Sequence, residues 1–201
     1  MNHADLEASS SIPGYDYGTR RSDLSPVSES ELSQLEQTAG WTGADVDVLA
    51  RHTDLFRAKA EAMVDSWRAV IGSQPHLARW FVKPDGAPDD AYKASIRRRF
   101  VQWVIDVAAR PHDRDWLNYQ QEIGLRHTPV KKNKTDSAHT PSHVPFRYLL
   151  GFVPVVLPIG GFFADAIEDD AELKRLEDAW TKAVLLHVTL WSRAYVAEDL
   201  W

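Results

Sequence analysis

The sequence predicts an all-α domain of about seven or eight helices. Its strong apolar patterns step by three or four residues, the spacing that lines one face of an α-helix. No segment alternates polar and apolar residues as a half-buried strand does, and the chain shows no internal repeat of about 20–50 residues. Because the expected helices differ in length and spacing, the patterns do not fit a coiled coil or a bundle of equal helices.

The N-terminal segment lacks these patterns. Residues 1–28 are rich in Ser, Pro and Gly and show no periodicity, so we expect an extended arm there. The segment also lacks the basic and then apolar layout of a signal peptide, so we expect no export. The whole chain has 201 residues, 44% of them hydrophobic, and residues 29–201 are expected to form one domain.

The first strong helical pattern covers residues 56–71. The helix is expected to begin after Asp54 and to end near Gly72 and Pro75, because glycine and proline commonly follow a helix. The apolar positions of its stripe are Phe56, Ala60, Met63, Trp67, Val70 and Ile71.

Two further helices are expected in the middle of the chain. Residues 88–109 offer Asp89 or Asp90 as the N-cap, and residues 113–127 form a second amphipathic segment. The first stripe holds Tyr92, Ile96, Phe100, Trp103 and Val107, and the second holds Trp116, Tyr119, Ile123 and His127.

The C-terminal part carries the longest amphipathic segment, residues 171–196. Its stripe consists of Leu173, Leu176, Trp180, Ala183, Val184, His187, Leu190 and Trp191. Before it, residues 148–163 form an apolar run that is interrupted by prolines and glycines. A membrane-spanning helix needs about 20 apolar residues, so we expect a buried or interface helix here, kinked at Pro154.

Composition argues against several partners and sites. A net charge of −6 provides no positive field for nucleic acid, and no membrane association is expected. The chain has no cysteine, which excludes disulfides, thiolate metal sites and thiol nucleophiles and makes the cytoplasm the expected compartment. Eight tryptophans are an unusually large number, and such flat side chains suit a large interface or a planar apolar partner.

Two of the eight histidines, His127 and His187, lie on apolar helical stripes, and the other six are interpreted as polar loop contacts. We expect His187 to be a core residue that hydrogen-bonds to a carbonyl or a neighbouring side chain. His127 stands in the last turn of its helix, because Pro129 disfavours helical geometry at Thr128. It is either a C-cap favoured by the helix dipole or the single protein ligand of a haem iron.

Several segments resemble the protoglobins, single-domain haem globins of archaea and bacteria that are related to the sensor domains of globin-coupled sensors. The resemblance runs in order over nearly the whole chain. It rests on "IPGYDYG" (12–18), "DSWRAVIGSQPHLARWF" (65–81), "PDGAPDDAY" (84–92), "RRRFVQWVID" (97–106), "WLNYQQEIGLRH" (116–127) and "KKNKTD" (131–136).

This resemblance implies a globin fold with an added N-terminal helix near residues 29–38. It implies haem b between the helices, with the arm, residues 1–28, folding over the haem edge. His127 closes the "EIGLRH" motif, and the resemblance makes it the proximal ligand of the iron. Val64 and Ile123 are further candidate contacts to the haem.

On the distal face, the resemblance places Trp67 and Phe100, and Arg68 stands where the family has a tyrosine. Two orientations of Arg68 remain open. Its long side chain can reach toward solvent or a haem propionate, or it can face the ligand position, where a fixed charge would favour superoxide-like bound oxygen, nitrite or peroxide.

Basic residues near the expected haem have similar alternatives. Arg99 is a candidate partner of a haem propionate, or part of a solvated face formed by residues 97–99. We interpret Lys131, Lys132 and Lys134 as a solvated loop.

The leading functional hypothesis is a haem-b globin that binds O₂, CO and NO at the iron face opposite His127. The resemblance also implies a homodimer through residues 148–163 and the C-terminal helix. Alternatives are a haem enzyme acting on peroxide, nitrite or NO, with carbene transfer as a non-natural activity, and a gas sensor that signals through a separate partner. A helical protein without haem is the last alternative.

Overall fold

The structure is a computed structural model that describes residues 12–201, so the first part of the expected arm lies outside the described residues. Within that range the chain forms nine α-helices, two short 3₁₀ helices and no strand, which confirms the all-α prediction. The α-helices are α2 (Glu29–Ala39), α3 (Gly43–Arg51), α4 (Thr53–Ser73), α5 (Pro75–Ala78), α6 (Asp90–Ala109), α7 (Arg114–Leu125), α8 (Phe146–Val156), α9 (Gly160–Phe163) and α10 (Asp170–Ser192). The 3₁₀ helices are η1 (Arg79–Phe81) and η2 (Glu198–Leu200).

Helix caps explain where the longer helices begin. The side chain of Asp89 accepts a hydrogen bond from the backbone N of Tyr92 (3.1 Å), which identifies Asp89 as the N-cap of α6. Asp113 does the same for α7 through the backbone N of Trp116 (2.9 Å). Such acceptors satisfy backbone N–H groups that have no partner within the helix.

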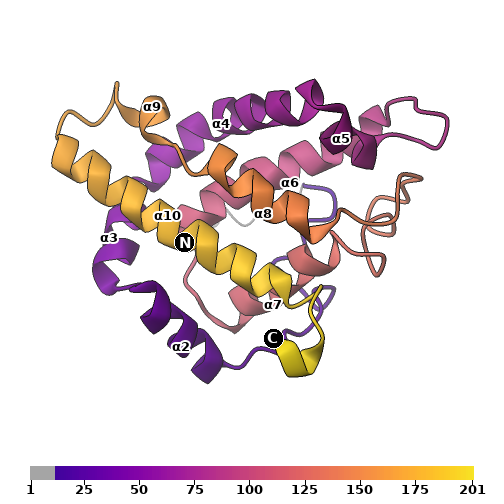
Figure 1. Cartoon of the computed structure of the whole chain (residues 1–201). Helices are drawn as coiled ribbons and strands as arrows, with labels where there is room; N and C mark the ends of the chain where they lie inside the picture. The colour runs from indigo at the N-terminus through magenta and orange to yellow at the C-terminus, as the bar shows by residue number, and fades with distance from the viewer. Residues whose placement is uncertain (1–11) are drawn as a thin grey trace.

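The helices pack in two main groups (Figure 1). α4 and α6 lie along each other, and α10 packs against α3 and α7. α8 contacts both α4 and α10 and so joins the groups. The predicted stripes meet in the core, where the rings of Phe56, Trp67 and Trp180 stack.

The arm lies against α6 and α7 over its described part, residues 12–28. The hydroxyl of Tyr15 donates to Asp106 of α6 (2.6 Å), and the backbone N of Ser25 donates to Asn118 of α7 (2.9 Å). Burial raises the pKa of Tyr15, and the adjacent Asp106 carboxylate adds to the shift, so the phenol stays protonated and keeps donating. These contacts hold the arm on the domain without a regular element.

Two details of the chain differ from the sequence prediction. Helix α3 was not predicted, because its nine residues are too few to show a clear period, although Thr42 and Asp45 form its capping box. The single helix expected over 148–163 is wrong: α8 ends at Val156, and α9 starts at Gly160. Pro158 falls between them and cannot donate the backbone hydrogen bond that a continuous helix would need.

No helix in residues 12–201 has the length and apolar character needed to cross a membrane.

Candidate functional site

A cavity of about 240 Å³ lies between α6, α7, α8 and α10. Its walls are mostly aromatic and aliphatic, which suits a large apolar ligand. The lining includes Ile71, Leu77, Trp80, Phe81, Tyr92, Ile96, Arg99, Phe100, Trp103, Tyr119, Ile123, Arg126, His127, Lys132, Tyr148, Phe152, Val184, Val188 and Trp191.

His127 is held in this wall by a tight turn after α7. The helix ends at Leu125, and the backbone N of His127 donates to the carbonyl of Gly124 (3.1 Å). His127 therefore lies two residues beyond the end of α7, so the prediction that it stands in the last turn of the helix is wrong. The ring Nδ1 donates to the carbonyl of Ile123 (2.8 Å), because a carbonyl can only accept.

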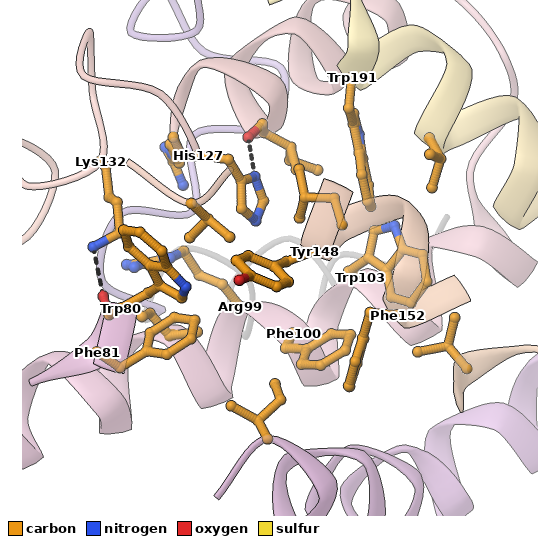
Figure 2. A pocket seen from close by; sticks show the side chains of 18 of the residues that line it. Trp80, Phe81, Arg99, Phe100, Trp103, His127, Lys132, Tyr148, Phe152 and Trp191 are labelled. Carbon is orange, nitrogen blue, oxygen red and sulfur yellow. Dashed lines mark hydrogen bonds between the residues drawn. The ribbon is translucent and has the colours of Figure 1, made fainter. Parts of the chain in front are cut away.

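That hydrogen bond fixes which nitrogen is available. With the proton on Nδ1, Nε2 carries the lone pair, and Figure 2 shows the second ring nitrogen of His127 pointing into the cavity. Burial lowers the pKa of His127 to about 4, with Lys132 and Arg126 adding to the shift and the Ile123 bond opposing it. The imidazole is therefore neutral near pH 7 and can ligate a metal.

Aromatic side chains occupy the space across from His127. The ring of Tyr148, from α8, projects into the cavity between His127 and Phe100 (Figure 2). Phe100 lies on the α6 wall and Phe152 on the α8 wall. A large ligand beside His127 would therefore have to move the Tyr148 side chain.

Lys132 brings a buried cation to the same wall, so its assignment to a solvated loop is wrong. Only 3% of Lys132 is exposed, and its Nζ donates to the carbonyls of Trp80 (2.9 Å) and Pro141 (2.8 Å) and to the hydroxyl of Thr140 (2.6 Å). Burial lowers its pKa to about 8. All three partners are neutral, so within residues 12–201 the Lys132 charge has no carboxylate partner.

Two other cations of the wall are paired. Arg99 donates to both carboxylate oxygens of Asp136 (2.9 and 2.5 Å) and to the carbonyl of Pro13 in the arm (2.7 Å). Arg126 donates to Glu122 (2.9 Å) and to Asp16 of the arm (2.9 Å). The arm therefore helps to orient both arginines.

A family model for Protoglobin matches residues 28–201. The chain belongs to the protoglobin family. Among solved structures, this protoglobin is similar to the globin domain of the Geobacter sulfurreducens globin-coupled sensor, with 16% identity and a TM-score of 0.65 over 82% of this chain and 97% of that chain. That likeness shows an all-α globin fold. None of the curated proteins matches.

The expected N-terminal helix of this protoglobin is α2, which is capped by a reciprocal pair between Ser28 and Glu31. Gly40 ends it with a φ of 64°, a left-handed conformation that glycine adopts without strain.

The predicted site residues of this protoglobin separate into two groups. His127, Ile123, Phe100 and Arg99 line the cavity together. Trp67 is not among the lining residues and packs behind Phe100, with ring centroids 5.6 Å apart.

The other two predicted residues lie on α4. Val64 is fully buried in the same core cluster as Trp67. Arg68 lines a neighbouring pocket between α4 and α6, and its guanidinium lies 3.8 Å from Asp65. Arg68 is therefore not among the residues that line the cavity beside His127.

Sequence reasoning missed Lys132 and Tyr148 as lining residues. Lys132 is one of several lysines in a short segment, and Tyr148 begins an apolar run, so neither carries a distinguishing local signal. No group of three or more His, Asp or Glu side chains in residues 12–201 is arranged to hold a metal ion.

Proposed function

We propose that this protoglobin binds haem b in the cavity and takes up O₂, CO or NO there. The observation that carries the proposal is His127: a neutral imidazole, held through Nδ1, that presents Nε2 to an apolar cavity. A haem needs one such ligand, because the porphyrin supplies the four equatorial ones. The haem would supply the iron that binds a diatomic gas.

The polar residues of the wall also fit a haem. Its two propionates are anionic, and Lys132 is a buried cation without a carboxylate partner within residues 12–201. Arg99 already has a bidentate carboxylate partner, so Lys132 is better placed than Arg99 to meet a propionate. The arm would cover this edge, because Pro13 and Asp16 contact the arginines of the wall.

The apolar walls would keep water away from the ligand position. Phe100, Phe152 and Ile96 offer no hydrogen-bond donors, so they favour neutral diatomic gases over hydrated anions. The Tyr148 side chain projects into the cavity and carries a hydroxyl that could donate to a bound ligand.

The alternative of nitrite or peroxide chemistry assisted by Arg68 has less support. The Arg68 side chain lies in the neighbouring pocket beside Asp65, so its charge does not face the cavity. A gas-sensor role would need a partner protein that reads the bound state.

Haem uptake is the deciding experiment. Adding haem to the purified apoprotein should give a Soret band and a ferrous–CO spectrum, and His127→Ala should lose the normal spectrum. His143→Ala is the control, because His143 is outside the cavity lining and contacts Trp80 from the loop before α8. The absence of a Soret band in the wild-type protein would contradict the proposal.

We also propose a homodimer through α8 to α10. Leu150 of α8 and Leu185 of α10 are among the large hydrophobic side chains that remain exposed, at 53% and 44%. α8 packs on α10, so exposed apolar side chains of both helices can contribute to one interface. In sedimentation equilibrium, the wild type should be a dimer and Leu150→Glu should be a monomer. A monomeric wild type would contradict the proposed dimer.

A further inference from the structure

A series of aromatic rings begins at His127. Trp191 of α10 stacks on His127 with ring centroids 6.0 Å apart and an interplanar angle of 26°. Trp103 and His187 each lie 5.9 Å from Trp191, and Figure 2 shows Trp191 and Trp103 at one side of the cavity near His127. The first part of the series therefore touches the proposed ligand of the iron.

The series continues to the surface of α2 and α3. His187 lies 5.2 Å from Trp116, Trp116 stacks on His112 at 4.0 Å, and His112 stacks on Trp41 at 4.9 Å. Trp41, directly after α2, is partly exposed. We call Trp191, Trp103, His187, Trp116, His112 and Trp41 the aromatic series.

Polar partners distinguish the aromatic series from ordinary core packing. The indole N–H of Trp103 donates to Nδ1 of His187 (2.8 Å), and the indole N–H of Trp191 donates to Oε1 of Gln120 (2.9 Å). His187 is 1% exposed, and its Nε2 has no hydrogen-bond partner in the described part of the chain. A core that needed only apolar contacts would not require a buried imidazole here.

Of the remaining tryptophans, Trp80 lines the cavity beside Tyr148 and His143 and does not belong to the aromatic series. The other three do not form such a path. Trp180 contacts Trp103, but it leads to Trp67 and Phe56, which are all fully or almost fully buried. Trp201 at the C-terminus donates to Ser192 and lies outside the aromatic series.

We propose that the aromatic series carries single electrons from a small reductant at Trp41 to the cavity when a peroxide is reduced at the haem. This rests on the haem proposed above. Indole is among the most easily oxidised side chains, and electron transfer slows steeply with distance, so short steps between neighbouring indoles are faster than one long step. The imidazoles of His187 and His112 bridge the indoles.

One hydrogen peroxide takes up two electrons and two protons and leaves as two waters; the protons come from solvent. Each electron leaves an indole, which is refilled by the next indole outward, and a one-electron organic reductant such as ascorbate refills Trp41. When Trp103 is oxidised, its N–H proton can shift to Nδ1 of His187 and return when the electron is replaced.

Peptide mapping of oxidised tryptophan after peroxide treatment tests this route. The protein is first loaded with haem and its Soret band recorded, so a failure to bind haem is seen separately from a failure of electron transfer. In the wild type, peroxide should oxidise Trp41 and freeze-quenched samples should show a tryptophan radical, and ascorbate should suppress both. In Trp116→Phe, oxidation of Trp41 should be lost and haem should bleach faster, because Trp116 joins His187 to His112.

Two further variants test whether the loss of Trp41 oxidation comes from misfolding of the variant protein. Trp116→Tyr keeps an oxidisable ring and should restore oxidation of Trp41, whereas Trp201→Phe should behave as the wild type. Haem-free protein gives the level of direct attack by peroxide. Wild-type oxidation of Trp41 that stays at this level, or that persists in Trp116→Phe, would overturn the proposal.

Discussion

The two histidines on apolar stripes have opposite hydrogen bonding: His187 is 1% exposed in the core, and His127 is partly exposed at the cavity wall. Nδ1 of His127 donates to the carbonyl of Ile123, which leaves a lone pair on Nε2 toward the cavity. Nδ1 of His187 accepts from the indole of Trp103, so its proton lies on Nε2, inside the core. Burial lowers the pKa of both.

The difference shows that residue type and a place on an apolar helical stripe do not decide the role of a histidine. The partner of Nδ1 decides which nitrogen keeps a lone pair, and only a lone pair that faces free space can bind a metal. His187 is the core histidine that its sequence context predicted, with Trp103 as the neighbour. Four perturbations test this contrast.

The largest effect is expected from His127→Gly, which should abolish the ferrous–CO spectrum of the haem-loaded protein. Within residues 12–201 the His127 side chain hydrogen-bonds to the Ile123 carbonyl and to no other group, so free imidazole can take the same place. Millimolar imidazole should therefore restore the spectrum. His187→Gly is the matched variant, and its spectrum should not depend on added imidazole. If it did, His187 and not His127 would be the candidate ligand of the iron.

His187→Ala should lower the free energy of unfolding by about 3 kcal/mol, because it leaves a core cavity and an unpaired Trp103 N–H. Urea unfolding of the apoprotein measures this value. His127→Ala should change it by less than about 1 kcal/mol, because its ring already faces a cavity. Equal losses in the two variants would mean that the histidines have the same structural role.

Lys132→Met should weaken haem binding by about tenfold, about 1.4 kcal/mol, through loss of a charge-assisted hydrogen bond. Binding of haem dimethyl ester, which has no free carboxylate, should not change. Fluorescence quenching of the tryptophans follows both titrations. An equal loss for haem and its ester would show that Lys132 acts only through the packing of its loop around Thr140 and Trp80.

The smallest effect concerns the anchoring of α10, which carries His187. Burial acts to raise the pKa of Asp45, but hydrogen bonds from Lys182 and Thr42 outweigh it, so the pKa lies below its usual 3.8. A lowered pKa stabilises the fold above pH 3.8, and this contribution disappears as the pH falls through the folded-state value.

Asp45→Asn should therefore cost about 1 kcal/mol at pH 7 and progressively less below pH 4. Urea unfolding at pH 7 and at pH 3 measures both values. A cost that stays constant with pH would show that the Asp45 charge is not involved. Asp47→Asn, on the same helix and without a resolved ion pair, is the control.

Local patterns predicted the helices that build the cavity. The stripes of α4, α6 and α10 and the cap at Asp89 depend on residues within a few positions of each other, so the sequence shows them directly. The short helix α3 and the break after Val156 have weaker local sequence signals and were not predicted. The family resemblance was confirmed over residues 28–201.

The sequence by itself determined an all-α domain and singled out His127, because helical spacing, caps and family motifs are local properties. Only the tertiary structure decided that Lys132 is buried and that Arg68 lies outside the cavity. The Lys132 ammonium is held by the carbonyls of Trp80 and Pro141. Trp80 is distant in the sequence, and Pro141 lies beyond the turn that contains Lys132. Hydrogen bonding and burial are set by groups that folding brings together, and no local pattern encodes them.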